Sequence, residues 1–134
     1  DVCSSDLYTY GIGSAVVSFT HGGYFTLSTE VGAEVTNAAL KEIYFELNRI
    51  QTELIPDSEL DLVRNYMLGT FLRSIDGPFA LADRFKGIHF HKLGYDYYDR
   101  YVDKIKSITP KELQALANKY LKKEDFIELV VGKK

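Results

Sequence analysis

The chain has very little cysteine and no long hydrophobic run. Cys3 is the only cysteine in 134 residues, so no disulfide can form within the chain, and the cysteine count indicates no redox compartment. No apolar stretch approaches the roughly 20 residues that a membrane-spanning helix needs. The sequence therefore predicts no membrane-spanning segment.

Positive charge is also in short supply. The 16 lysines and arginines are outnumbered by 19 aspartates and glutamates, which gives a net charge of −3. A protein that binds duplex nucleic acid needs a clustered basic face, so no nucleic-acid partner is expected. Tyr95, Tyr97, Tyr98 and Tyr101 could stack on single-stranded bases, but in an acidic chain this helical spacing is more typical of packing.

The first seven residues are set apart from the rest. Asp1–Leu7 resembles the translation of a sequencing-adapter oligonucleotide, so we interpret residues 1–7 as an adapter-derived artefact or a polar tail, outside the fold. Residues 8–134 have the length and composition of one globular domain. On this interpretation the domain is incomplete at its N-terminus.

Residues 8–31 predict an antiparallel β-hairpin. Residues 8–19 alternate between apolar and small polar side chains, as a half-buried strand does. Thr20-His21-Gly22-Gly23 is expected to form the turn, with the glycines supplying positive φ. In the second strand, one face is expected to carry Phe25, Leu27, Thr29 and Val31, and the other Tyr24, Thr26, Ser28 and Glu30.

Beyond the hairpin the apolar period changes to that of helices. The first helix has the stripe Leu40, Ile43, Tyr44, Leu47 and Ile50. Pro56–Glu59 separates it from a second helix with the stripe Leu60, Val63, Met67 and Phe71, which leaves Arg64 outside.

Three more helices and a strand are expected to follow. One spans about residues 79–92, with Gly94 as its terminator. The next is marked by Tyr98, Tyr101, Val102 and Ile105, and the last begins at Thr109–Glu112, a capping box with proline at the first helical position. Residues 126–131 read as a final strand. Strands that are segregated from helices predict an α+β fold, with helices packed on one face of a mainly antiparallel sheet.

Five stretches resemble, in order, motifs of the pitrilysin/insulinase-type zinc peptidases. They are Tyr8–Ser14 with Gly23–Phe25, Glu59–Leu60 with Asn65–Gly69, Leu93–Tyr98, Ser107–Leu121, and Val130–Gly132. The resemblance covers nearly all of the chain from Tyr8 onward. It implies that residues 8–134 are the C-terminal, non-catalytic half of such an enzyme, a mitochondrial-processing-peptidase-like domain.

The catalytic half of these peptidases carries zinc in an H-x-x-E-H motif with a distal glutamate, and the motif's own glutamate takes the proton of the attacking water. This sequence contains no H-x-x-E-H. His89 and His91, two residues apart on an expected helix, would point about 200° from each other and could not share a metal ion. The resemblance therefore implies that zinc lies in a catalytic partner domain, upstream in the same chain or in another subunit, and that this segment is inactive alone.

The resemblance also implies a substrate site. The non-catalytic half of the family contacts substrate through an arginine and a tyrosine seven positions later; the tyrosine falls on Tyr10 and the arginine position on Cys3. A phenol can donate a hydrogen bond to a substrate carbonyl or to the oxyanion that forms from it. Tyr8, on the same strand face by parity, is a second candidate, and plain packing of Tyr10 on the sheet is the alternative.

Two functions from different classes follow. In the first, the domain binds and positions peptide substrate for the catalytic partner. In the second, it is a structural subunit derived from a peptidase, without a role in proteolysis. An H-x-x-E-H motif upstream or in a neighbouring gene would favour the first.

Overall fold

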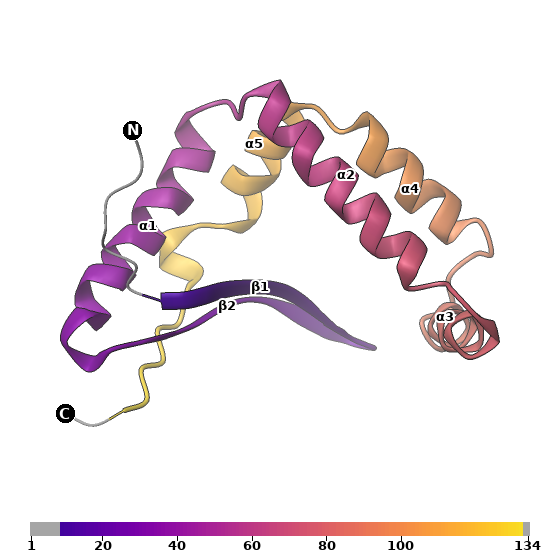
Figure 1. The fold of residues 1–134 in the computed structure, drawn as a ribbon, viewed down its shortest axis with the longest axis horizontal. Helices are drawn as coiled ribbons and strands as arrows, with labels where there is room; N and C mark the ends of the chain where they lie inside the picture. The colour runs from indigo at the N-terminus through magenta and orange to yellow at the C-terminus, as the bar shows by residue number, and fades with distance from the viewer. Residues whose placement is uncertain (1–8, 133–134) are drawn as a thin grey trace. The chain divides into compact units, whose positions relative to one another are not determined.

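The computed structural model describes residues 9–132, apart from the side chain of Tyr10. Within this range it contains a two-stranded antiparallel sheet and five α-helices, which confirms the predicted α+β class. The elements are β1 (Thr9–Phe19), β2 (Gly22–Val31), α1 (Thr36–Thr52), α2 (Asp57–Arg73), α3 (Pro78–Phe90), α4 (Tyr97–Ser107) and α5 (Pro110–Tyr120), with short 3-10 turns at Ala33–Val35 and Lys123–Asp125 (Figure 1).

The chain divides into two compact units. The first, which we call the hairpin unit, comprises Asp1–Arg49 and Leu121–Lys134, and the second, the helical unit, comprises Ile50–Tyr120. None of the helices in the described residues is long and apolar enough to cross a membrane.

The predicted hairpin is confirmed in its type and its faces. β1 and β2 pair antiparallel with Phe19 opposite Gly22 and Val16 opposite Phe25. Side chains at Phe25, Leu27, Thr29 and Val31 are half-buried, whereas Ser28 and Glu30 between them are exposed. The four residues predicted to share a face are thus all half-buried, and of the opposite face only Thr26 is half-buried as well.

The role predicted for the turn glycines is wrong. Gly22 and Gly23 belong to β2, and the connection is Thr20-His21; neither glycine has a positive φ. Gly23 is required for a different reason, because a Cβ there would lie 2.6 Å from the backbone carbonyl oxygen of Val17 on the facing strand. Close approach of the two strands, rather than a left-handed conformation, excludes a side chain at this position.

Phe126 is the centre of the packing in the hairpin unit. Its ring meets those of Phe25 on β2 and Tyr44 on α1 edge-on, at 6.4 Å in both cases. The Lys123 ammonium lies 4.9 Å from the centre of the Tyr44 ring. A hydrogen bond to Glu128 is the main cause that raises the pKa of Tyr44 above its usual value. The predicted stripe of α1 agrees with this packing, since Leu40, Ile43, Tyr44, Leu47 and Ile50 are all half-buried.

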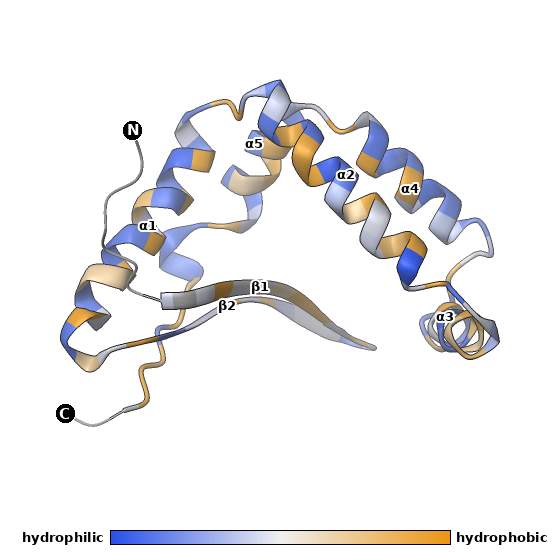
Figure 2. Ribbon diagram, in the orientation of Figure 1, coloured by the Kyte–Doolittle hydropathy of each residue, from blue (hydrophilic) through white to orange (hydrophobic). Residues whose placement is uncertain are grey.

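The strand predicted over residues 126–131 does not form in the described structure. Phe126 has extended dihedrals, but no strand among the described residues pairs with the segment. Ile127, Leu129 and Val131 are 95%, 85% and 88% exposed, and Figure 2 shows this segment as a hydrophobic run near the C-terminus. A β-strand exists only through hydrogen bonds to a neighbour, so a strand-like sequence is insufficient by itself where no strand pairs with it.

In the helical unit, α2 to α5 each contribute one buried apolar residue. These residues are Leu60, Ile88, Ile105 and Ala117. The stripe predicted for α2 is wrong at three positions: Val63 and Met67 are exposed, and Arg64 is half-buried. The Arg64 guanidinium donates to the carbonyl oxygen of Ile108 and pairs with Asp61 at 2.5 Å. The side chain is only 21% exposed, because two of its guanidinium nitrogens have oxygen partners within the helical unit, which periodicity alone could not reveal.

The helix ends confirm one expected signal and correct another. Thr109 and Glu112 form the predicted capping box at α5: the Glu112 N–H donates to Thr109 Oγ1 at 3.2 Å, and the Thr109 N–H donates to Glu112 Oε2 at 2.9 Å.

Gly94 does not terminate α3. The left-handed residue is Lys92, at φ 55°, and the Leu93 N–H reaches the Ile88 carbonyl at 2.9 Å while the Lys92 N–H reaches His89 at 3.2 Å. This is a Schellman closure with lysine where glycine is usual.

Candidate functional site

The predicted substrate residues lie at the start of β1. Tyr10 belongs to β1 by its backbone, but its side chain lies outside the described residues. Tyr8, the second candidate, and Cys3, the position of the family arginine, also lie outside them. The site must therefore be built from the backbone at Tyr10 and from its described neighbours.

A β-bulge occurs at Tyr10. Thr9 pairs with Val31 and Ile12 pairs with Thr29, so two residues of β1, Tyr10 and Gly11, stand opposite the single residue Glu30 of β2. A bulge of this kind bends the strand and redirects the side chains on either side of it. The prediction that Tyr8 and Tyr10 share one strand face by parity assumed a regular strand, whereas the register shifts between Thr9 and Ile12.

Hydrogen bonds between the two strands hold the bulge in place. Thr9 Oγ1 donates to the Gly11 carbonyl at 2.7 Å and accepts the Gly11 N–H at 3.1 Å. Thr29 Oγ1 lies 2.7 Å from Thr9 Oγ1 and 3.0 Å from the Gly11 carbonyl oxygen. Polar groups that the extra residue takes out of the regular ladder are thus satisfied by two threonine side chains.

The outer edge of β1 is open. Among residues 9–132 the sheet has only the strands β1 and β2, so each strand has one edge without a strand neighbour. From Gly11 to Phe19 every β1 residue except Val17 is exposed, with Ile12 at 55% and Val16 at 75%. Because pairs in an antiparallel ladder alternate, every second residue of β1 turns its N–H and C=O toward this free edge.

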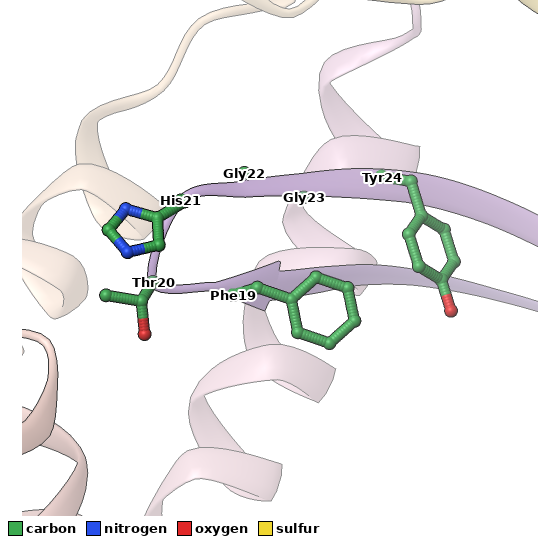
Figure 3. Close-up of a pocket in the computed structure, with 6 residues that line it drawn as sticks. All are labelled: Phe19, Thr20, His21, Gly22, Gly23 and Tyr24. Atoms are coloured by element: carbon green, nitrogen blue, oxygen red, sulfur yellow. The ribbon is translucent and has the colours of Figure 1, made fainter.

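A shallow hollow lies at the other end of the hairpin. Figure 3 shows its lining, the turn residues together with the rings of Phe19 and Tyr24, which lie on the same side of the ribbon. The ring centres are 6.1 Å apart, and both side chains are more than half exposed. The lining is mostly apolar and carries one imidazole, His21, and one phenol, Tyr24.

No group of three or more His, Cys, Asp or Glu side chains in the described part of the chain could hold a metal ion. His89 lies in the last turn of α3 and stacks on Phe85 at 6.5 Å, while His91 caps the same helix and packs against Phe90. Both imidazoles therefore contact aromatic side chains.

The sequence patterns did not reveal a second hollow, in the helical unit, lined by Arg84 together with aromatic residues of α2 and α4. The spacing of Phe71, Tyr98 and Tyr101 predicted that these rings would pack. It could not predict that an arginine from α3 would lie over them.

The fold and the open edge define an α+β protein with an exposed β-hairpin. A scan against protein-family models finds no match for this chain, and a search of curated protein sequences finds none either.

Proposed function

We propose that this chain holds extended peptide along the free edge of β1, as the non-catalytic half of a zinc metalloendopeptidase of the pitrilysin/insulinase type. The observation that carries the proposal is the long, exposed edge strand that begins next to Tyr10. Zinc and the water-activating glutamate belong, in this proposal, to an H-x-x-E-H domain in the same chain or in a partner subunit.

The edge of β1 has the chemistry to bind a peptide backbone. Its outward N–H and C=O groups repeat along 11 residues, and an added strand pairs with such groups independently of its own side chains. Soluble proteins usually protect a long edge with charge, proline or covering elements. Residues Gly11–Phe19 contain no charged residue and no proline, so β1 lacks these protections.

The bulge supports a substrate-contacting role for Tyr10, because it changes the direction of side chains relative to a regular strand. It interrupts the ladder at the point where the five-stretch resemblance puts the substrate tyrosine. Bulges commonly occur beside active sites, where they re-aim one side chain. A phenol at this position would donate to a carbonyl of the bound peptide while the residues from Ile12 onward hold its backbone.

Strand addition can be tested with two peptides of the same sequence. In one, every odd backbone amide is N-methylated, and in the other every even amide. An added strand uses only alternate amides, so one peptide should bind the chain like the unmethylated parent and the other should lose affinity, measured by fluorescence anisotropy. Equal affinity, or equal loss, for the two peptides would reject binding at a strand edge.

The tyrosine is tested in the assembled enzyme. Replacement Tyr10→Phe should lower peptide turnover, by roughly fivefold if an ordinary hydrogen bond is lost and by up to about 100-fold if the phenol serves the oxyanion. Tyr24→Phe, at the hairpin tip, is the matched control and should leave turnover unchanged. Wild-type kinetics for Tyr10→Phe, with the fold intact by circular dichroism, would remove Tyr10 from the mechanism.

A structural subunit is the second candidate, and the exposed segment Ile127–Val131 favours it. A contiguous apolar surface of this kind commonly marks a protein–protein interface. Peptide affinity distinguishes the two candidates. A structural subunit would associate with its partner through this segment, but it would bind neither the methylated nor the unmethylated peptides.

A further inference from the structure

The helical unit contains an aromatic pocket with one cationic group. The pocket has a volume of about 350 Å³ and is lined by residues of α2, by Arg84 of α3 and by tyrosines of α4. The Arg84 guanidinium lies 5.9 Å from the centre of the Phe71 ring and 5.5 Å from that of Tyr98. Phe71 also contacts Tyr101, at 5.5 Å. Rings and a guanidinium thus form one continuous wall.

Arg84 has no carboxylate partner among the described residues, although Arg49, Arg64 and Arg100 each pair with one three or four positions earlier. Its own positions three and four away hold Ala80, Leu81, Gly87 and Ile88. The neighbouring acid, Asp83, pairs with Lys86 instead. The charge of Arg84 is therefore not neutralised by the helix that carries it.

The hydrogen-bonding capacity of Arg84 is only partly used. One Nη2 N–H donates to Ser74 Oγ at 2.5 Å, whereas a guanidinium has five N–H donors in a planar fork that matches a carboxylate. The guanidinium carbon lies within 6 Å of the centres of both the Phe71 and the Tyr98 rings, which are not hydrogen-bond acceptors of the carboxylate kind. Its N–H edges remain the groups that an anion would bind.

The charge and size of the pocket restrict the ligand. A cage of aromatic rings can hold an organic cation, but here a guanidinium already lies over the rings and would repel one. Arg84 is the single charged residue of the lining. At about 30 Å³ for each water in the liquid, the volume corresponds to about a dozen heavy atoms. Volume and composition agree with those of small-molecule sites.

We propose that this pocket binds a carboxylate carried on an aromatic body, with the carboxylate on Arg84 and the body against Phe71, Tyr98 and Tyr101. The proposal does not depend on peptide binding at β1. Two sources have this chemistry: a free aromatic carboxylic acid, and the C-terminus of a peptide that ends in an aromatic residue.

The test is a titration of the isotope-labelled full chain, followed by amide chemical shifts. The probes are 3-phenylpropionate, the uncharged 3-phenylpropanamide and phenethyltrimethylammonium. We expect saturable shifts near Ser74, Arg84 and Tyr98 with the acid, with a dissociation constant on the order of millimolar for a ligand of this size. The amide should bind at least tenfold more weakly, and the cation not at all. Equal binding of acid and amide, shifts elsewhere, or no saturation would overturn the proposal.

Variants separate the role of Arg84 from stability. Arg84→Gln should weaken binding of 3-phenylpropionate at least tenfold, while Arg100→Gln, on the exposed face of α4, should leave it unchanged. Ser74→Ala removes the hydroxyl that accepts the Arg84 hydrogen bond and keeps the charge of Arg84. Binding of 3-phenylpropionate should therefore be retained or tightened, and weaker binding by this variant would contradict the proposal. If Arg84→Gln does not fold, the relative affinities of the wild-type chain for the acid, the amide and the cation still test the proposal.

Two further probes distinguish a free aromatic acid from a peptide C-terminus as the natural ligand of the pocket. They are the tripeptide Ala-Ala-Phe with a free C-terminus and the same tripeptide as its amide. Tighter binding of the free tripeptide than of 3-phenylpropionate would assign the pocket to peptide C-termini. Weaker binding would assign it to free aromatic acids.

Discussion

Three hydrogen bonds hold the Glu112 carboxylate in its charged form. A hydrogen bond from Lys104, followed by bonds from the backbone and the hydroxyl of Thr109, lowers the pKa of Glu112 to about 2. The same carboxylate thereby caps α5 and, through Lys104 at 2.8 Å, ties α4 to it. A single side chain at a helix start thus serves both local and tertiary structure.

The depressed pKa of Glu112 predicts a loss of stability in acid. The carboxylate stabilises the fold fully above its unfolded pKa of 4.5, and this contribution should disappear as the pH falls from there through about 2. Glu112→Gln should therefore lower the thermal midpoint at neutral pH, and the difference from wild type should vanish near the lower value. Glu42→Gln, an exposed residue of α1, is the control for loss of one charge. A difference that persists unchanged in strong acid would contradict the assignment.

Two glycines should respond to alanine with opposite signs. Gly77 caps α3 at φ 91°, a conformation that costs a side chain about 1–3 kcal/mol. Gly69 lies inside α2, and a Cβ there would meet nothing within 4 Å, so alanine should stabilise by about 0.5–1 kcal/mol. Chemical denaturation of Gly77→Ala and Gly69→Ala measures both. The same sign for the two variants would be inconsistent with the backbone at Gly77.

At the scale of elements, the end of α3 departs from the usual preference for glycine in the left-handed position. α3 closes through a left-handed lysine although Gly94 stands two residues later. Gly94 could not have ended the helix, because the reversal of the backbone already occurs at Lys92. A glycine near a helix end indicates a terminus but does not specify which residue takes the left-handed position.

Lys92→Gly should stabilise the chain. A lysine in the left-handed region costs roughly 1 kcal/mol that glycine does not, and the closing hydrogen bonds of the Schellman motif are made by the backbone in either case. Lys86→Gly, on the exposed side of α3, is the matched control and should destabilise by about 1 kcal/mol. Both are read from urea unfolding, and a destabilised Lys92→Gly variant would contradict the assigned closure.

At the scale of the whole molecule, both units expose large apolar side chains, on helices such as α2 and α3 as well as on the extended segments of the hairpin unit. Ile12 and Val16 on β1 and Ile127, Leu129 and Val131 near the C-terminus are all more than half exposed. A two-stranded ribbon is only marginally stable in water. Both features fit a unit whose extended segments act by pairing with other chains or domains.

The purified chain should not cleave peptides. None of its described residues forms a metal-binding group, and the sequence has no H-x-x-E-H to activate water. A fluorogenic peptide should stay intact with the chain alone and be cleaved, in a manner sensitive to chelators, when an H-x-x-E-H domain is supplied. Chelator-sensitive cleavage by the isolated chain would reject the division of labour proposed above.

Local signals predicted a large part of this fold. The antiparallel hairpin, its inward face at Phe25 and Leu27, the stripe of α1 and the capping box at Thr109 all depend on residues that are near one another along the chain or directly paired across a two-residue turn. In such cases side-chain spacing and backbone preference act on the same geometry.

Contacts between residues far apart in the sequence determined the features that local patterns did not predict. The apolar run at residues 126–131 has the composition of a strand, yet a strand also needs hydrogen bonds to a neighbour, and no strand among the described residues pairs with this segment. Arg64 entered the packed face of α2 because Ile108 and Asp61 offered it oxygens, and Arg84 entered a ring of aromatics because two other helices put Phe71 and Tyr98 beneath it. By itself, then, the sequence determined where the chain turns, coils and extends. Only the tertiary structure decided which strand-like segment is left unpaired and which charges lie against rings, because both depend on partners from remote parts of the chain.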